Sequence, residues 1–291
     1  MVPRDHLRLP RSWGFREWSG RPGDDRAYDA RMVRWDPGVY GTFADERARP
    51  FLDLTSRLDG LSPARVVDLG CGTGELTATL ADQWPEAEVL GIDSSAEMLA
   101  AAEAVASDRA NLRFRQQAIQ EWEPTADVDL VVSNAALQWV PGHRELLRSW
   151  LPRLHPAATV AVQIPGNEDS PSQVLLRQLA AEPRWAAALE GVDGVIARVG
   201  GMRDYLDVFL ESGHRVEGWE TTYQHVLTGD DAVLQWMRGT RLRPYAAALG
   251  ASADAFIDEL RPRLRAAYPA EHGATVFGFR RLFVVGGPVP A

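Results

Sequence analysis

The chain has 291 residues, 45% of them hydrophobic, so it can bury a substantial core, and its formal net charge is −9. Basic residues are scattered among acidic ones, which argues against an extended nucleic-acid surface. The single cysteine, Cys71, excludes an intrachain disulfide, and no apolar run is long enough to cross a membrane, so we expect a cytoplasmic protein.

The first 31 residues have no periodic pattern and are rich in Arg, Pro, Gly and Asp. They also lack the apolar centre of a signal peptide. We therefore expect residues 1–31 to form a loose extension and residues 32–291 to form the folded domain.

From residue 65 onward, strand-like and helix-like segments alternate, which is typical of α/β proteins with a parallel sheet. The pattern predicts strands over residues 65–70, 88–93, 112–117, 128–135 and 158–165. It predicts helices over residues 75–84, 94–106 and 143–154. Ser94 and Glu97 have the spacing of a capping box at the start of the second helix.

After residue 165 the alternation is no longer strict. Helices are predicted over residues 172–189, 202–213, 230–248 and 252–267, and strands over residues 214–227 and 275–286. The prediction is an α/β fold with a doubly wound, mostly parallel seven-stranded sheet that ends in an antiparallel C-terminal hairpin. We expect residues 60–165 to form the ligand-binding core and residues 166–270 to carry a helical lid.

The turn after the first strand reads VVDLGCGTGELT, residues 66–77. Gly70, Gly72 and Gly74 follow G-x-G-x-G spacing, whereas dinucleotide-binding turns follow G-x-G-x-x-G. Glycines at a helix N-terminus let a ligand approach the backbone. The acids Asp68 and Glu75 would repel a pyrophosphate, so the turn favours a ligand with a cationic end.

S-adenosylmethionine (AdoMet) is such a ligand, because it carries an ammonium group and a sulfonium. Asp93 ends the second strand and can accept hydrogen bonds from both hydroxyls of a ribose. Met98 and Ile119 are predicted apolar contacts for adenine. A glycine at such a turn is about as often only a matter of backbone geometry, and an aspartate at the end of a strand is more often a helix cap or a surface acid. Only the combination favours AdoMet. We interpret Cys71 as a small buried residue.

Several stretches carry a resemblance to known families. VVDLGCGTGELT and GIDSSAEML (91–99) resemble motifs one and two of the class I AdoMet-dependent methyltransferases, which have a Rossmann-like fold. The remaining stretches are similar to the trans-aconitate 2-methyltransferase family: WDPGVY (35–40), SNAALQWV (133–140), VAVQIPGN (160–167), ETTYQHVL (220–227) and FRRLFVV (279–285). The resemblance implies a carboxyl O-methyltransferase that converts trans-aconitate, a small tricarboxylate, to a monomethyl ester and releases S-adenosylhomocysteine (AdoHcy).

The resemblance also implies which segments line the site. Asn134, Gln138 and Trp139 follow the fourth strand, at the edge where open α/β sheets bind ligands. We expect Asn134 to border the cofactor, and Gln138 and Trp139 to border the acceptor. Trp35 and Tyr40 belong to a segment that folds over the cofactor in the family, so they are candidates for closing the pocket.

Binding of substrate carboxylates calls for arginines, whose planar fork holds a carboxylate with two hydrogen bonds. Arg280 and Arg281 alternate on the last strand, and the resemblance favours Arg281. Tyr223, His225 and Arg243 are further candidates. A Tyr and a His flanked by apolar residues are more often core residues, and Arg243 could equally be a solvated residue at a helix end.

Ala118 is a departure from the family, whose members often have an acid at this position that contacts the adenine amine. Backbone groups or Gln117 could replace that contact, and the sequence leaves the choice open.

Other functions were weighed. A methyltransferase of similar fold could instead act on a malonyl group held by an acyl carrier. Such an enzyme would need a basic patch to dock the carrier. A dinucleotide-dependent oxidoreductase is disfavoured by the glycine spacing, and a non-catalytic binding protein by the intact cofactor motif. No metal centre is expected, because the six histidines are dispersed. The sequence determines neither which carboxylate is methylated nor the oligomeric state.

Overall fold

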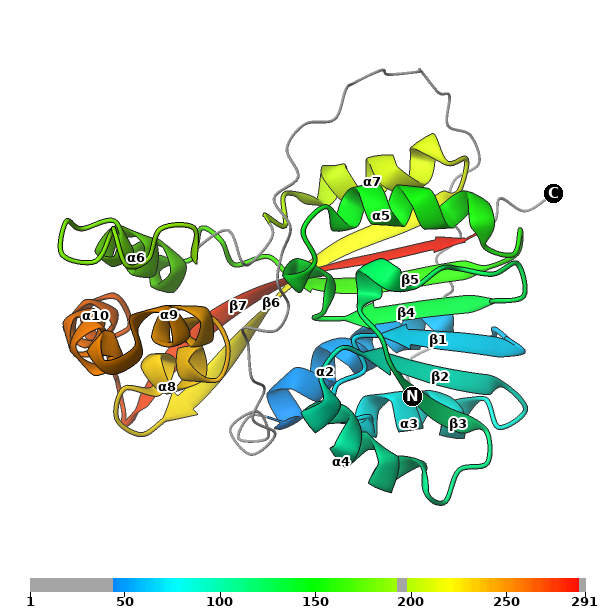
Figure 1. Cartoon of the computed structure of the whole chain (residues 1–291), viewed down its shortest axis with the longest axis horizontal. Helices are drawn as coiled ribbons and strands as arrows, with labels where there is room; N and C mark the ends of the chain where they lie inside the picture. Colours follow the sequence, from blue (N-terminus) through cyan, green and yellow to red (C-terminus); the bar gives the residue numbers. More distant parts are fainter. Residues whose placement is uncertain (1–43, 193–197, 288–291) are drawn as a thin grey trace, which may run out of the picture.

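The computed structural model of the chain describes residues 44–192 and 198–287. Residues 1–31, Trp35 and Tyr40 lie outside these ranges, so the predictions for them stay predictions. In the described part, a twisted sheet lies between two layers of helices, and a group of further helices is displaced to one end of the molecule (Figure 1).

The sheet has seven strands in the order β3-β2-β1-β4-β5-β7-β6, and β7 is antiparallel to both of its neighbours. This topology confirms the predicted fold class. The strands are β1 (Arg65–Leu69), β2 (Glu88–Asp93), β3 (Leu112–Gln116), β4 (Leu130–Asn134), β5 (Thr159–Pro165), β6 (Arg215–Thr228) and β7 (Ala274–Gly287). The central strands are buried on both faces, as their runs of β-branched residues indicate.

The helices divide into three groups. One face of the sheet packs against α2 (Ala44–Thr55), α3 (Glu75–Gln83) and α4 (Ala96–Ala106). The other face packs against α5 (His143–Trp150) and α7 (Met202–Glu211). The third group comprises α6 (Pro171–Ala180), α8 (Ala232–Arg238), α9 (Leu242–Leu249) and α10 (Ala253–Ala267). We call residues 166–192 and 229–273 the helical insertion.

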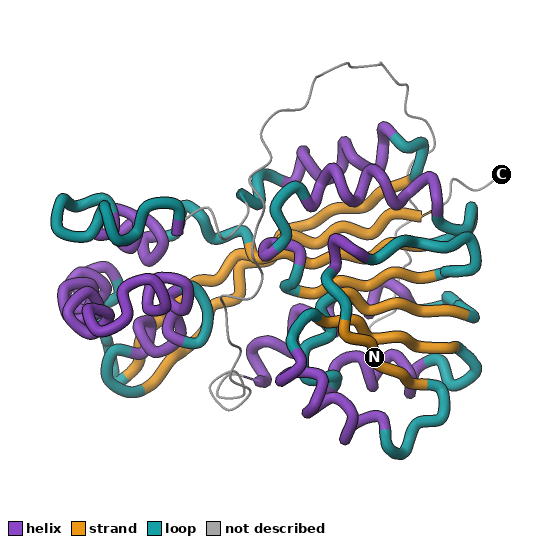
Figure 2. Tube along the Cα trace, in the orientation of Figure 1, coloured by secondary structure: helices purple, strands orange, loops and turns teal. Residues whose placement is uncertain are grey.

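The β6–β7 hairpin connects the helical insertion to the sheet. The two strands pair along their whole length, from Arg215–Gly287 to Thr228–Ala274, whereas β7 pairs with β5 only as far as Arg281. Beyond Arg281 the hairpin projects from the sheet, and the helices of the insertion pack on this projecting part (Figure 2). The insertion has its own hydrophobic cluster, which includes Phe277 of β7.

Several predicted helix boundaries are wrong; the helix predicted over 143–154, for example, ends at Trp150. The helix predicted over 172–189 ends at Ala180, because Pro183 follows closely and disfavours helical backbone in the residue before it. The stretch 230–248 forms two helices, α8 and α9. The break between them places Pro244 in the first turn of α9, where a missing N–H costs little. The N-cap of α4 is Ser95, whose hydroxyl accepts from Met98 N at 3.2 Å, and not Ser94.

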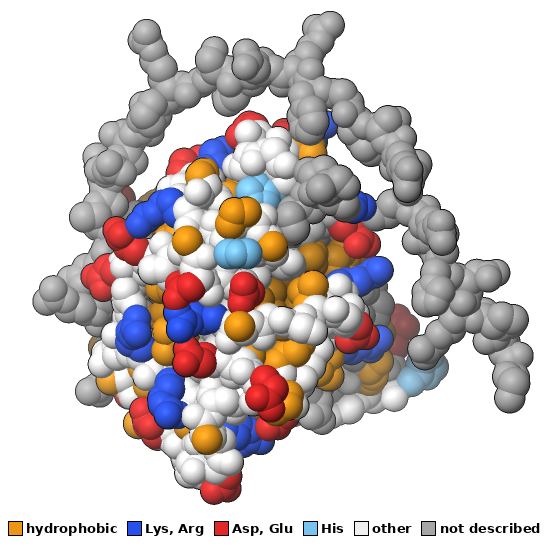
Figure 3. All heavy atoms as spheres, turned by 90° about the vertical axis from the view of Figure 1, so that its right-hand side faces the viewer, with side chains coloured by type: hydrophobic (Ala, Val, Ile, Leu, Met, Phe, Trp, Pro, Cys, Tyr) orange, Lys and Arg blue, Asp and Glu red, His pale blue; other side chains and the backbone are white. Residues whose placement is uncertain are grey.

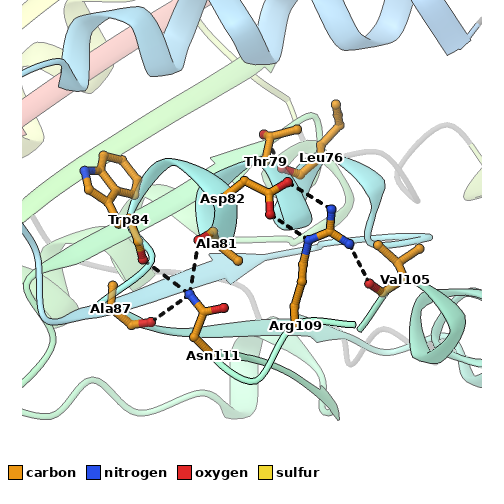
Figure 4. Close-up of polar contacts among 9 residues, drawn as sticks. All are labelled: Leu76, Thr79, Ala81, Asp82, Trp84, Ala87, Val105, Arg109 and Asn111. Atoms are coloured by element: carbon orange, nitrogen blue, oxygen red, sulfur yellow. Dashed lines mark hydrogen bonds and ion pairs between the residues drawn. The ribbon is translucent and has the colours of Figure 1, made fainter. Parts of the chain in front are cut away.

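Asn111, just before β3, ties α3 to the neighbouring turn (Figure 4). Its side-chain amide Nδ2 donates to the carbonyl oxygens of Ala81, Trp84 and Ala87 at 3.1–3.3 Å. Two of these carbonyls belong to the end of α3 and the residue after it, where helix carbonyls lack partners within the helix. Asn111 therefore caps the helix from another part of the chain.

The described face at the amino ends of the parallel strands carries mixed charge. Figure 3 shows basic and acidic side chains interspersed on its coloured part, without a large patch of one sign. Among the described helices, none is both long and apolar enough to cross a membrane.

We expect Asn111→Ala to lower the free energy of unfolding by about 1–3 kcal/mol, because it leaves the three carbonyls without this donor. Arg153→Ala is the control, since Arg153 makes an exposed ion pair with Glu123 at 2.6 Å and surface pairs contribute little. Urea unfolding followed by circular dichroism measures both variants. An equal loss of stability in the two would contradict the capping role.

Candidate functional site

A cavity of about 490 Å³ lies where the hairpin leaves the sheet. Its walls include the carboxyl ends of β1 and β4, strand β7, the helical insertion, and residues of α2, α3 and α4. This is the edge at which open α/β sheets bind ligands.

The glycine turn after β1 forms one wall. Gly70 and Gly72 line the cavity, and the N–H of Gly70 donates to Ile92 O at 2.7 Å. A Cβ added to Gly72 would meet no atom within 4 Å, so a side chain there would enter the space left for a ligand. Gly74 does not line the cavity, and a Cβ there would meet the Phe114 ring at 2.5 Å. Packing against Phe114 therefore requires a glycine at position 74.

Asp93 holds the glycine turn against the start of α4. One of its carboxylate oxygens accepts from Gly72 N and the other from Ser95 N, each at 2.9 Å. Burial raises the pKa of Asp93 above its ordinary value, although these backbone donors oppose the effect. Asp93 does not itself line the cavity, but a carboxylate accepts about four hydrogen bonds, so capacity remains for a ribose hydroxyl.

Asp68 brings a buried carboxyl group to the cavity wall. Thr77 Oγ1 donates to it at 2.6 Å, and burial raises the pKa of Asp68 to about 7. Cys71 is buried beside it, and its pKa is raised by burial and by the charges of Asp68 and Asp93. The thiol therefore stays protonated, in agreement with the reading of Cys71 as a small buried residue.

Asn134 and Gln138 bring amide groups to the cavity from the end of β4. Asn134 Oδ1 and Gln138 Oε1 are both buried and have no hydrogen-bond partner within residues 44–192 and 198–287. Buried polar atoms of this kind generally find a partner in a ligand or a water molecule. Trp139 lines the cavity beside them, and Ala135 adopts a positive φ of 54° in the same turn.

Arg281 lines the cavity from β7, with 4% of its surface exposed. Its Nη1 donates to Gln163 Oε1 at 3.3 Å, and its guanidinium lies 4.5 Å from the centre of the Phe279 ring. Arg280 points to the other side of the strand, where it pairs with Glu220 at 2.5 Å. The predicted alternation of the two arginines is thus what the structure shows.

Gln163 was missed by the sequence reasoning. It is fully buried in β5, opposite Asn134 in the register of β4 and β5, and its Nε2 has no partner among the described residues. The signal was available, because Gln163 is a polar residue inside the apolar strand VAVQIP. Its position beneath Arg281, however, depends on the pairing of β5 with β7.

Other predicted residues lie around the cavity without lining it. Tyr223 donates from its hydroxyl to Asp53 Oδ2 at 2.6 Å, and the ring of His225 packs 4.7 Å from that of Trp236, which does line it. Arg243 lies in the first turn of α9. Of the adenine candidates, Met98 and Ile119 are buried.

Gln117 also stands near the predicted adenine region. Its Nε2 donates to Glu121 O at 2.8 Å, and its N–H donates to Asp93 O at 2.9 Å. Its Oε1 is buried and has no partner in the described part of the chain. An acceptor therefore exists one residue before Ala118.

The insertion contributes lining residues that the sequence did not single out: Trp236, Met237, Thr240 and Arg241, with Phe277 and Phe279 of β7 beside them. Their identity as cavity residues depends on how the hairpin carries the insertion, which no local pattern reveals.

Comparisons with known proteins identify the family. Residues 66–157 match a family described as "Methyltransferase domain". The trans-aconitate 2-methyltransferase of Rhodococcus jostii is 49% identical over 86% of this chain and 98% of its own length. That of Streptomyces coelicolor is 48% identical over 88% of this chain and 87% of its own.

The YcgJ protein of Bacillus subtilis shares the fold, with a TM-score of 0.55 over 84% of this chain and 99% of its own, at 14% identity. At that identity the likeness concerns the fold alone. The matches to the two sequence relatives span 98% and 87% of the relatives' own lengths. The chain therefore belongs to the trans-aconitate 2-methyltransferase family.

Proposed function

We propose that this protein transfers a methyl group from AdoMet to a carboxylate of trans-aconitate and so forms its monomethyl ester. The observation that carries the proposal is the set of charged groups in one cavity: Asp68 and Glu75 line it at the glycine turn, and Arg281 lines it from β7. Glu168, which also lines it, accepts from Val199 N. The names of the relatives agree with this activity.

The glycine turn fits the methyl donor. Gly72 leaves open space beside the backbone, and Asp68 offers a carboxylate to a cationic group. Asp93, Met98 and Ile119 suit the ribose and adenine, with Asn134 at the edge of β4. When bound, AdoMet supplies an electrophilic methyl group on its sulfonium.

The acceptor fits the opposite wall. Arg281 provides a buried guanidinium that can hold a carboxylate with two hydrogen bonds. Gln138 and Trp139 border the space between this arginine and the glycine turn. Tyr223, His225 and Arg243 remain predictions for this role, as do Trp35 and Tyr40.

The chemistry requires orientation rather than a base. A carboxylic acid with an ordinary pKa of about 4 is already ionised at pH 7, so its oxygen can attack without proton transfer. The oxygen–methyl bond forms as the sulfur–methyl bond breaks, and the electron pair of that bond stays on sulfur, giving AdoHcy. Good alignment can contribute on the order of 7–11 kcal/mol, and aromatic walls exclude water.

A malonyl group on an acyl carrier is the second candidate, and the relatives do not favour it. The buried arginine suits a small acceptor that enters the cavity completely. We also keep the expectation of a cytoplasmic enzyme, which the single buried cysteine supports.

The first test is to incubate the purified protein with AdoMet and, separately, trans-aconitate, cis-aconitate, citrate and isocitrate, and to detect methyl esters by mass spectrometry. We expect a monomethyl ester from trans-aconitate together with AdoHcy. Binding of AdoMet without any ester would contradict the acceptor assignment and leave the cofactor assignment standing.

Affinity for AdoMet should increase as the pH rises toward 7 and level off above it. Burial raises the pKa of Asp68 to about 7, and a cationic ligand prefers its ionised form, so below this pH binding must release a proton. Well below pH 7, the association constant for AdoMet should rise by about tenfold per pH unit. Calorimetry from pH 5.5 to 8.5 measures it. Asp68→Asn should bind more weakly with a flatter profile, and an unchanged profile in this variant would exclude Asp68.

Arg281→Ala should raise the KM for trans-aconitate by about 10- to 100-fold, the value of a charged hydrogen bond, while the Kd for AdoMet stays nearly constant.

Gln163→Glu should also raise the KM for trans-aconitate, because a carboxylate beneath Arg281 competes with the acceptor. Gln163→Leu, which only removes the hydrogen bond, should raise KM less. Equal effects of the two Gln163 variants would show that Gln163 only fills space.

A further inference from the structure

A second arginine, Arg241, reaches the same cavity from the helical insertion. It directly precedes α9, whereas Arg281 belongs to β7. Two guanidinium groups that arise from different structural units therefore face one ligand space.

The backbone around Arg241 is fixed by its neighbours. Met237 and Leu242 are buried in the hydrophobic cluster of the insertion, with 1% and 2% of their surfaces exposed. Thr240 N donates to Met237 O at 3.1 Å, and Arg243 N donates to Thr240 O at 3.2 Å. With both flanks anchored, residue 241 is held at the cavity wall.

Arg281 lies away from the acids at the glycine turn. Asp68 belongs to β1, and β7 is three strands further along the sheet, a separation of roughly 14 Å at about 4.8 Å per strand. Glu168 is the acid that lines the cavity from the segment after β5, and its Oε1 accepts from Val199 N at 2.5 Å. The arginine end thus suits an anionic ligand.

A tricarboxylate that presents one carboxylate to the methyl group brings two others into the cavity. Each buried carboxylate needs a charged or hydrogen-bonding partner, because an unpaired buried charge is strongly unfavourable. A single arginine fork is matched to one carboxylate. The acceptor therefore requires a second partner beside Arg281.

We propose that Arg241 binds one of the two non-reacting carboxylates and Arg281 the other, so that the helical insertion determines the preference for tricarboxylates over dicarboxylates. This inference rests on the proposed function, since it takes a tricarboxylate acceptor as given. It assigns Arg241 a role in specificity.

The test measures binding to the complex of the protein with AdoHcy, so that it does not depend on turnover. Calorimetry gives the Kd for trans-aconitate and for three dicarboxylates that each lack one of its carboxylates: mesaconate, glutaconate and itaconate. We expect Arg241→Ala to raise the Kd for trans-aconitate by about 10- to 100-fold. The same variant should leave unchanged the Kd for the one dicarboxylate that lacks the carboxylate held by Arg241.

Arg281→Ala should spare a different dicarboxylate. If both variants spare the same compound, if Arg241→Ala weakens all four ligands equally, or if it weakens none, the proposal is wrong. Failure of the proposed function gives another result, namely no methyl ester from trans-aconitate with the wild-type protein and AdoMet.

Arg238→Ala is the matched control, because Arg238 is an exposed arginine in the last turn of α8 and does not line the cavity. It should leave every Kd unchanged. An unaltered Kd for AdoHcy shows that each variant is folded. Arg241→Lys, which keeps the charge and loses the planar fork, should give an intermediate Kd for trans-aconitate.

Discussion

Strand β7 is the constraint on which the rest of the structure depends, because it belongs both to the sheet and to the projecting hairpin. It pairs with β5 from Arg281 to Gly286 and with β6 along its full length. Phe283 lies in the core under α2, whereas Phe277 lies in the hydrophobic cluster of the insertion. Arg281 sits at the last pairing with β5, so the same backbone that joins the two units also fixes the arginine at the cavity.

The charges of the site are buried, and each is held by neighbours of its own. Thr77 supports Asp68, two backbone N–H groups support Asp93, and Gln163 and the Phe279 ring support Arg281. In a region of low dielectric constant, such groups act more strongly on a ligand than they would in water. The same burial raises the pKa of both acids. A cationic ligand favours the ionised carboxylates, so binding of a cation promotes loss of their protons.

The parts of the fold that depend on near neighbours in the sequence were predictable. The strand runs, the glycine turn and the alternation of Arg280 and Arg281 follow from local pattern alone, and the structure agrees with them. Pro244 indicated a break in the helical stretch, but the break lies between Arg238 and Leu242, a few residues before the proline. The offset from Ser94 to Ser95 reflects two adjacent serines that compete for one cap, which spacing cannot distinguish.

The roles of Gln163 and Arg241 could not be predicted in this way. Gln163 matters because β5 and β7 are paired, and Arg241 because the hairpin carries α8 and α9 over the edge of the sheet. Both facts concern segments that are far apart in the sequence. A single sequence shows which residue types are present, but it does not show which of them meet.

The separate hydrophobic cluster of the insertion has a consequence for how such an enzyme diversifies. Substitutions in distant, independently packed regions have nearly additive effects, so the insertion can be altered without rebuilding the glycine turn or its two aspartates. The donor end of the cavity belongs to the sheet, whereas the acceptor end combines sheet residues such as Arg281 with residues of the insertion such as Arg241. Exchanging both parts of the insertion, residues 166–192 and 229–273, which share one hydrophobic cluster, would therefore alter the acceptor end and leave the donor end unchanged.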